Sequence, residues 1–291
     1  MDEPDSRVVF PANLPELFYV WSKFPKAKLA AGGTEFLRNQ NGRIPVLPEK
    51  LISLDRLEEL RKIRRTEKYL EIGAMTTLNR IVQLGRIVPE ILVQCIECIA
   101  SPQLRSLATI GGNLCNISQK LDCSAPMIAL DAQYELRKEG SARWISAARF
   151  SSLPGPPDLA RQELMTRIRI PLNVWNFRKY RKLRASGNNE PGGGMLFIMR
   201  FEKNILANIR VVYSGQIILR ERSGEIMLEG KRLPLNRKDV SAFIDKWKAY
   251  LSVYEGNENS IFAGIGVNSH PDLERKQLLN FIENTLHGIS E

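Results

Sequence analysis

Two glycine pairs in the first half of the chain have the residue types of phosphate-binding turns. The apolar segment Leu29-Ala30-Ala31 runs into Gly32-Gly33-Thr34, and Thr109-Ile110 runs into Gly111-Gly112-Asn113. Because glycine lacks a Cβ atom, consecutive backbone N–H groups remain accessible and can converge on phosphate oxygens, with Thr or Asn as an additional donor. We therefore expect two strands that each end in a bare turn and together hold a diphosphate. The alternative is a pair of ordinary tight turns, which Gly-Gly also forms.

Other kinds of site have weaker support in the sequence. Neither glycine pair fits the Rossmann or Walker pattern, which disfavours an ordinary dinucleotide or nucleoside triphosphate site. The two histidines, His270 and His287, lie near the C-terminus, which argues against a hydrolytic triad or a histidine-rich metal site. The four cysteines share one window, and their spacing matches neither a disulfide framework nor a structural zinc site: Cys95, Cys98, Cys115 and Cys123. We therefore expect reduced cysteines, no metal site and no acid–base catalytic residue.

The composition is that of a globular protein. A length of 291 residues suggests two domains, and 43% hydrophobic with 25% charged residues excludes extended disorder. No apolar run reaches the ~18 residues of a membrane-spanning helix, and the acidic start Met1-Asp2-Glu3 is unlike a secretory signal, so we expect a cytoplasmic protein. The net charge of +10 is spread over both halves and favours an acidic partner, which could be nucleic acid, an anionic cofactor or an acidic protein surface.

Hydrophobic periodicity predicts an α/β region followed by a smaller α+β region, separated by a polar stretch around residues 171–194. In the first region we expect strands at 7–10, 27–31, 68–73, 134–137 and 165–170, and helices at 11–23, 54–63, 89–101 and 124–130. In the second region we expect strands at 195–201, 205–213 and 216–220, and helices at 238–253 and 272–287. These three strands should form one antiparallel sheet beside the helices.

Five short motifs occur in a characteristic order along the first half of the chain. They are Ala31-Gly32-Gly33-Thr34-Glu35-Phe36-Leu37, Ile72-Gly73-Ala74-Met75-Thr76-Thr77, Ser101-Pro102-Gln103-Leu104-Arg105, Ala108-Thr109-Ile110-Gly111-Gly112-Asn113 and Leu130-Asp131-Ala132. In this order and spacing the chain resembles the medium, FAD-binding subunit of molybdenum hydroxylases, the flavoprotein family of xanthine dehydrogenase and carbon monoxide dehydrogenase. The resemblance covers nearly the whole length, since Ile168-Arg169-Ile170-Pro171 matches the end of the flavin domain and Leu228-Glu229-Gly230-Lys231 resembles the C-terminal domain.

The resemblance implies an α+β fold. It places a two-part α/β FAD-binding domain of the vanillyl-alcohol-oxidase-like type in residues 1–175, with subparts of about 1–53 and 54–175. A smaller α+β domain of the carbon monoxide dehydrogenase flavoprotein type, with a three-stranded antiparallel sheet and helices, follows in residues 176–291. Since both histidines lie far from the glycine pairs, FAD should be bound without a covalent link.

By the same resemblance, two segments bracket the FAD diphosphate: Lys28, Leu29, Ala30, Ala31, Gly32, Gly33, Thr34 and Glu35 in the first, and Thr109, Ile110, Gly111, Gly112 and Asn113 in the second. Asp122 occupies the place of an aspartate that contacts the flavin nucleotide, although it could equally cap a helix over 124–130. Met165 occupies a place where the family offers a backbone contact to the flavin ring, and its alternative role is strand core.

A family lysine lies near the isoalloxazine, where a positive charge would stabilise the anionic reduced flavin. Lys182 is the preferred candidate, and Lys179 is the second. The basic run 178–184 could instead be a solvated strand edge or, with its aromatic residue, a nucleic-acid contact. One departure concerns Gln119-Lys120-Leu121, which stands where the family commonly has Pro-Ala-Ala and bears on FAD occupancy and on the choice of electron acceptor.

The resemblance implies an electron-transfer subunit of a molybdenum hydroxylase. It would work beside an iron–sulfur [2Fe-2S] subunit and a molybdopterin-binding subunit, and pass electrons from the clusters through FAD to NAD or another acceptor. No nucleic acid and no membrane span are expected. Two alternatives remain open: a basic, flavin-free scaffold or nucleic-acid-binding module, and a flavin oxidoreductase that works alone.

Overall fold

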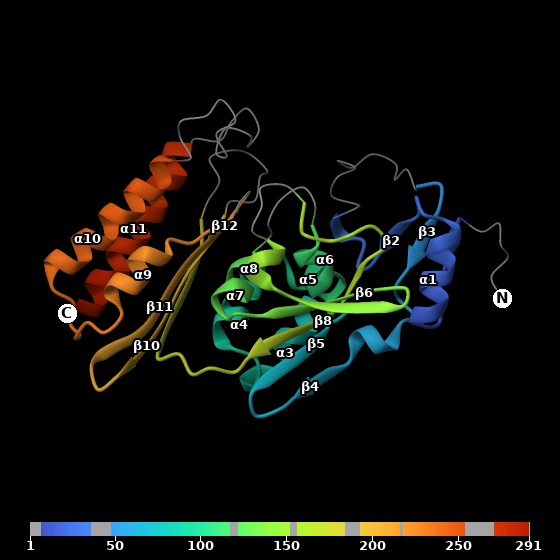
Figure 1. Cartoon of the computed structure of the whole chain (residues 1–291), viewed down its shortest axis with the longest axis horizontal. Helices are drawn as coiled ribbons and strands as arrows, with labels where there is room; N and C mark the ends of the chain where they lie inside the picture. Colours follow the sequence, from blue (N-terminus) through green and yellow to red (C-terminus); the bar gives the residue numbers. More distant parts are fainter. Residues whose placement is uncertain are drawn as a thin grey trace.

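The computed structural model describes residues 7–35, 48–116, 122–151, 156–183, 193–215, 218–253 and 271–290. These residues form three β-sheets that follow one another along the long axis of the molecule, each with its own helices (Figure 1). Mixed α+β architecture, as expected, is therefore observed. Within the described residues, no helix is long and apolar enough to cross a membrane.

The N-terminal sheet is small and parallel. Strand β3 (Leu51–Ser53) lies between β1 (Val8–Val9) and β2 (Lys28–Ala30) and runs parallel to both. Helix α1 (Leu14–Lys23) connects β1 to β2; its N-cap Asn13 accepts a hydrogen bond from the Glu16 N–H, and a proline stands in its first turn. Its buried Leu14 and Leu17 pack in a cluster with Ile52. The predicted strand-helix-strand unit is confirmed.

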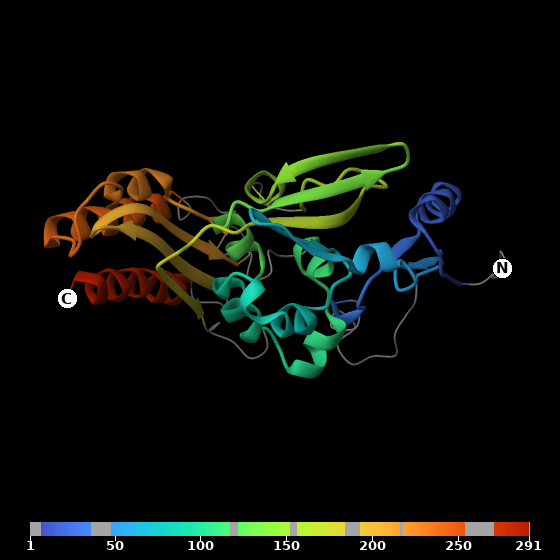
Figure 2. The same cartoon turned by 90° about the horizontal axis from the view of Figure 1, so that it is seen from below.

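The central sheet has five antiparallel strands in the order β4-β5-β8-β6-β7. They are β4 (Ile63–Arg65), β5 (Tyr69–Gly73), β6 (Gln133–Lys138), β7 (Ser141–Ser146) and β8 (Leu164–Pro171). The helices of this part are α3 (Leu78–Gln83), α4 (Glu90–Glu97), α5 (Pro102–Leu107), α6 (Ile110–Leu114), α7 (Ser124–Ala129) and α8 (Ala147–Phe150). Helices α3 to α7 gather on one side of the sheet, as Figure 2 shows, and the apolar side chains between them form the largest core cluster.

The expectation of a helix over residues 54–63 is wrong. Only one 3₁₀ turn, η1 (Glu58–Arg61), forms there, and the chain then enters β4. The reason is sheet pairing: the Leu54 N–H donates to the Ala30 carbonyl next to β3, and Ile63 pairs with Ile72 in β5. These long-range hydrogen bonds prevail over the local helical pattern.

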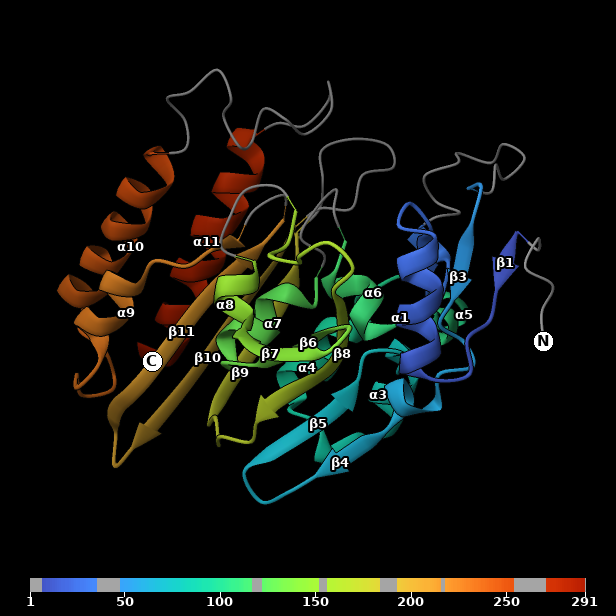
Figure 3. The ribbon, with the colours of Figure 1, turned by 45° about the vertical axis from the view of Figure 1, so that its right-hand side comes forward.

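The C-terminal sheet has four antiparallel strands rather than three, in the order β12-β11-β10-β9. They are β9 (Phe177–Lys182), β10 (Gly194–Glu202), β11 (Ile205–Ser214) and β12 (Ile218–Leu219). The additional strand is the basic run, which pairs along β10 and forms the sheet edge, so the reading of that run as a strand edge is correct. Helices α9 (Arg222–Leu228), α10 (Arg237–Ser252) and α11 (Pro271–Ser290) lie on one face of this sheet (Figure 1 and Figure 3). The sequence patterns had indicated α10 and α11 but not α9.

Strand β10 is buried on both faces. Phe197 and Met199 point into the cluster formed with α10 and α11, whereas Leu196 and Ile198 belong to the core of the central sheet and its helices. This alternation follows from the two-residue period of a strand. The C-terminal sheet is therefore packed directly against α4 and α7, with β9 in contact with α4 and β11 with α7.

Candidate functional site

The two glycine segments lie side by side. A Cβ atom added to Gly32 would overlap the carbonyl group of Leu107, and a Cβ atom on Gly112 would come to 3.9 Å from that of Ala31. The turn after β2 therefore packs onto the end of α5 and the start of α6. Residues about 80 positions apart in the sequence thus form one surface, as a site that grips a ligand from two sides requires.

The first segment presents unpaired backbone donors. Lys28, Leu29 and Ala30 form β2, a bend at Ala31-Gly32 and Gly33 follows it, and Thr34 and Glu35 begin a helical segment. Gly33 has φ +70, a conformation that glycine adopts without strain, and a Cβ atom there would meet nothing within 4 Å. Within the described ranges, the N–H groups of Gly32, Gly33 and Thr34 donate no hydrogen bond. Consecutive free N–H groups of this kind can bind an anion.

The second segment has a different structure from the one expected. It is not a strand that ends in a bare turn: Thr109 is the N-cap of the short helix α6, and its Oγ1 accepts the Gly112 N–H at 3.1 Å. The Gly111 N–H donates to the Ala74 carbonyl at 2.9 Å, and a Cβ atom on Gly111 would lie 2.8 Å from that same oxygen. The glycines here permit close packing, and their N–H groups are already used. A helix forms here instead of a bare turn because the Thr109 hydroxyl caps its N-terminus.

Asn113 connects the second segment to Asp122. Its buried side chain accepts the Cys123 N–H through Oδ1 at 3.3 Å. Asp122, which is 8% exposed, does not cap the following helix: α7 has Cys123 as its N-cap and no side-chain cap hydrogen bond. The capping role considered for Asp122 is therefore wrong.

The Asp122 carboxylate instead pairs with Lys182. Its Oδ1 accepts from Lys182 Nζ at 2.5 Å and from the Tyr180 hydroxyl at 2.7 Å. Lys179 lies on the other face of β9, where its Nζ stands 5.5 Å from the ring centroid of Phe281 in α11. Strand alternation thus separates the two candidate lysines, and Lys182 is the one that joins Asp122.

Tyr180 was not identified as a site residue from the sequence. Its ring stands beside Gly194, where an added Cβ atom would lie 2.8 Å from Tyr180 Cζ. Burial raises the pKa of Tyr180, and the neighbouring Cys95 and Asp122 raise it further, so the phenol stays protonated and donates to the carboxylate. The aromatic residue considered for nucleic-acid contact is therefore engaged inside the protein. Its position two residues before Lys182, on the same strand face, is the signal that would have indicated it.

Met165 lies in β8 and is 2% exposed, so its alternative role as strand core is confirmed. A β-bulge interrupts the pairing of β6 with β8 here, because Met165 pairs with Leu136 and Arg167 with Glu135, leaving Thr166 as the extra residue. The Thr166 carbonyl accepts the Ala74 N–H at 3.0 Å, which ties the bulge to the residue that packs on Gly111. A backbone contact of Met165 to flavin stays a prediction.

The four thiols form no disulfide, and two of them are buried. All four cysteines are free; Cys95 and Cys123 are buried, and Cys98 is exposed. Burial raises the pKa of Cys115 to about 12. No group of three His, Cys, Asp or Glu side chains suited to a metal ion occurs among the residues described. Gln119-Lys120-Leu121, Phe36, Leu37 and His270 lie outside the described residues.

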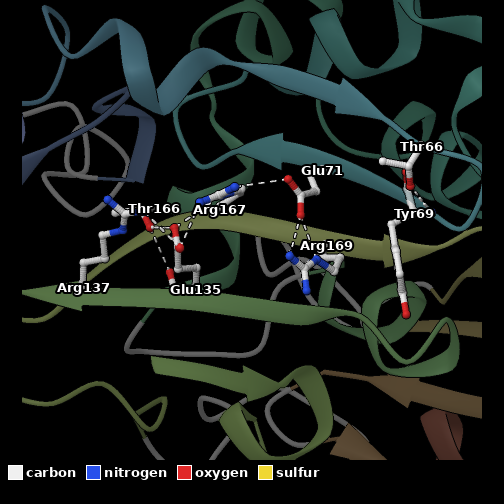
Figure 4. A network of polar contacts seen from close by, with 8 residues as sticks. All are labelled: Thr66, Tyr69, Glu71, Glu135, Arg137, Thr166, Arg167 and Arg169. Carbon is white, nitrogen blue, oxygen red and sulfur yellow. Dashed lines mark hydrogen bonds and ion pairs between the residues drawn. The ribbon is translucent and has the colours of Figure 1, made fainter. Parts of the chain in front are cut away.

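A second polar network covers the other face of the central sheet (Figure 4). Arg167 bridges Glu71 and Glu135, and Arg169 binds Glu71 with an N–O distance of 2.7 Å. The Arg169 guanidinium also stands 4.1 Å from the ring centroid of Trp144. Burial raises the pKa of both carboxyl groups, but hydrogen bonds and charges from the arginines outweigh it, so both pKa values lie below the ordinary range. This network joins β8 to its two neighbours in the sheet, β5 and β6.

The comparisons with known proteins define the class. Residues 4–173 match the family model described as FAD binding domain in molybdopterin dehydrogenase, so this chain belongs to that family. The resemblance found in the sequence is thereby confirmed for residues 4–173, and FAD is the cofactor of this domain.

Individual relatives agree with this class. The chain is 30% identical to the carbon monoxide dehydrogenase medium chain of Hydrogenophaga pseudoflava over 213 residues, 70% of this chain and 73% of that one. It is 30% identical to the xanthine dehydrogenase FAD-binding subunit of Escherichia coli O157:H7 over 167 residues, 55% of this chain and 56% of the relative. In the solved carbon monoxide dehydrogenase of H. pseudoflava, one chain superposes with a TM-score of 0.81 at 26% identity, covering 99% of this chain and 98% of that chain.

Proposed function

We propose that this chain is the FAD-binding electron-transfer subunit of a molybdenum-containing hydroxylase or dehydrogenase of the xanthine dehydrogenase type. The observation that carries the proposal is the row of N–H groups at Gly32, Gly33 and Thr34 that donate no hydrogen bond within the described residues. Gly33 has open space beside it, and Gly32 packs close to the segment that carries Gly111 and Gly112. In a member of an FAD-binding family, such a row is suited to a diphosphate.

The residues would divide the work as follows. The turn after β2 would bind the diphosphate oxygens through its N–H groups, and Thr34 would add a hydroxyl. The segment 109–113 would form the facing wall. Asp122 and Lys182 would lie at the flavin end, with Lys182 preferred over Lys179, and Met165 would offer a backbone contact to the ring. When bound, FAD would accept electrons from one partner and release them to another.

The finer fold and the domain division belong to this proposal. We assign residues 1–175 to a two-part FAD-binding domain of the vanillyl-alcohol-oxidase-like type, with parts 1–53 and 54–175, and 176–291 to the C-terminal domain. The family match ends at residue 173, and β8 ends at Pro171. The four-stranded sheet with α9, α10 and α11 has a core cluster of its own.

The proposed partners would carry the redox centres that this chain does not have the residues to bind. Two [2Fe-2S] clusters need four thiolates each, and the chain has four cysteines in total, so the clusters would belong to an iron–sulfur subunit. A molybdopterin-binding subunit would oxidise the substrate. One relative is named a medium chain and another an FAD-binding subunit, which supports a hetero-oligomer. NAD or another acceptor would take the electrons, and we place the complex in the cytoplasm.

Reconstitution with FAD tests the proposal. The purified full chain should bind FAD with a bound-flavin absorption spectrum, and Gly33→Val should abolish binding because the side chain is strained at φ +70 and would fill the open space. Anaerobic addition of substrate should bleach the flavin in the complex but not in the isolated chain. A wild-type chain that never takes up FAD, but shifts nucleic acid in a salt-dependent manner, would instead support the basic scaffold. Turnover by the isolated chain would support a self-sufficient oxidoreductase.

A further inference from the structure

Tyr180 and Lys182 share one oxygen of Asp122 across the junction of two parts of the fold. Asp122 precedes α7 in the central part, whereas both donors project from β9 of the C-terminal sheet. The distances to Oδ1 are 2.7 Å from the Tyr180 hydroxyl and 2.5 Å from Lys182 Nζ. The aspartate is 8% exposed, so little water competes for the carboxylate. Lys182 retains 27% exposure of its side chain and is the open member of the group.

We propose that Tyr180 is a positioning residue that holds Asp122 and Lys182 as a compensated ion pair, so that Asp122 sets how much of the lysine's positive charge reaches the flavin. The inference rests on the proposed function, which puts Lys182 beside the flavin ring. It goes beyond that function by assigning a role to Tyr180 and by giving Asp122 an electrostatic role.

The surroundings of Tyr180 are built around its hydroxyl. Gly194 stands opposite Lys182 on the neighbouring strand, and a Cβ atom there would lie 2.8 Å from Tyr180 Cζ and nearer still to its oxygen. The missing side chain leaves room for the ring to extend toward Asp122. Because burial keeps the phenol protonated, its hydroxyl serves as a donor to the carboxylate. A phenylalanine would fill the same space without this bond.

The charges predict opposite effects for the three side chains. A lysine near the flavin favours the reduced, more negative cofactor, and a carboxylate at hydrogen-bond distance cancels much of that effect. Removing the charge of Asp122 would leave Lys182 uncompensated. Removing the Tyr180 hydroxyl would leave more negative charge on Oδ1, because one donor is lost. Removing Lys182 would leave the carboxylate alone with its tyrosine donor.

The test is a reductive titration of the full chain reconstituted with FAD, with a reference dye to give the flavin midpoint potential. Asp122→Asn should shift the potential to more positive values, and Tyr180→Phe and Lys182→Met to more negative values. Gly194→Ala should shift it in the same direction as Tyr180→Phe, because it displaces the ring. Tyr19→Phe, at an exposed tyrosine on α1, is the matched control and should leave the potential unchanged.

Affinity gives a second readout. Loss of the Tyr180 hydroxyl should weaken FAD binding by up to about tenfold, in line with one hydrogen bond to a charged group, as measured from quenching of flavin fluorescence. A purely structural role of Tyr180 would lower affinity without the opposite signs of the potential shifts. The inference is overturned if Tyr180→Phe leaves the midpoint potential unchanged, or shifts it in the same direction as Asp122→Asn.

The outcomes separate this inference from the proposed function. If the wild-type chain fails to bind FAD, the proposed function is wrong. If the wild type binds FAD but Asp122→Asn does not retain it, the midpoint potentials of Tyr180→Phe and Lys182→Met test the inference. Shifts to more negative values in both variants support it, and any other combination overturns it.

Discussion

Gly32 is in contact with the backbone of Leu107, since a Cβ atom on Gly32 would lie 2.7 Å from the Leu107 carbonyl carbon. Gly33, the next residue, has the opposite environment, with open space around the same position. One glycine of the pair therefore lets two segments approach, and the other leaves room for a ligand.

This contrast predicts separable effects of substitution. Gly33→Ala should cost about 1 kcal/mol of stability, because φ +70 disfavours an L side chain, and should also weaken FAD binding. Gly140→Ala is the matched control, since Gly140 has φ +71 in open space at the turn between β6 and β7. It should lose similar stability, measured by urea unfolding, and keep the FAD affinity. Equal FAD affinities for both variants would contradict the phosphate role of Gly33.

The network on the central sheet predicts acid sensitivity. The pKa values of Glu71 and Glu135 are lowered in the folded state, so their contribution to the free energy of unfolding is present above the ordinary pKa near 4.5. It should be lost as the pH falls below that value. Glu71→Gln should lower stability at pH 7 by about 1–3 kcal/mol and flatten the pH dependence between pH 5 and 3, measured by urea unfolding. Glu97→Gln, at an exposed side chain, should follow the wild-type curve.

Arg210 connects the C-terminal sheet to the end of α7. Its guanidinium donates to the Ala129 carbonyl, pairs with Asp131 and stands 4.9 Å from the Trp175 ring centroid. Arg210→Ala should lower the free energy of unfolding by about 2–4 kcal/mol, because the hydrogen bond, the ion pair and the ring contact of a mostly buried cation are lost together. Arg200→Ala, at an exposed arginine of the same sheet, should change it by less than about 0.5 kcal/mol. Equal thermal shifts for the two variants would show that the Arg210 contacts add nothing.

Thiol reactivity should distinguish one cysteine from three. Cys98 is exposed, whereas Cys95 and Cys123 are buried and the Cys115 thiol has a pKa raised to about 12. Burial and the nearby Asp122 also raise the pKa of Cys98, so its reaction with a disulfide reagent should be slow at neutral pH. We expect one thiol per folded chain to react and all four after denaturation. Cys98→Ser should remove the reaction of the folded chain; reaction of a second thiol would contradict the expected protection of the other three.

Local patterns predicted those elements in which one face is apolar. The strand-helix-strand unit at the N-terminus and the helix α4 follow such patterns, with Ile91, Leu92 and Cys95 on the buried face. The helix expected at 54–63 failed because its apolar residues serve strands and turns, which depend on partners distant in the sequence. Strand β9 was not counted among the strands of the sheet because Arg178, Lys179 and Arg181 conceal its two-residue period.

The residues of the candidate site were predictable to a similar degree. The motifs indicated both glycine segments, Asp122 and Lys182, and the structure places these residues around one region. Tyr180 depends on which strand face meets Asp122, and Gly194 on which residue stands opposite in the neighbouring strand. The two-residue spacing indicates that Tyr180 shares a strand face with Lys182, but which residues that face meets depends on strand pairing and packing, which no single segment of the sequence reveals. The helical structure of residues 110–114 was likewise hidden, because Gly-Gly is a poor helix former and the helix depends on the Thr109 cap and on contacts with Ala74 and Thr76, which are distant in the sequence.

The pairing of β9 with β10 determines what the proposed flavin region meets. With Leu196 opposite Tyr180 and Gly194 opposite Lys182, one face of β9 carries the tyrosine and lysine toward Asp122. A slip of this pair by one residue would exchange the faces and point Lys179 and Arg181 inward, so two cations would confront one carboxylate with no tyrosine donor. An insertion or deletion of one residue inside β9 would therefore change the charge that faces Asp122, even where the inserted or deleted residue does not itself contact Asp122. In this chain, the alignment of two adjacent strands would therefore determine the charge of the proposed flavin region.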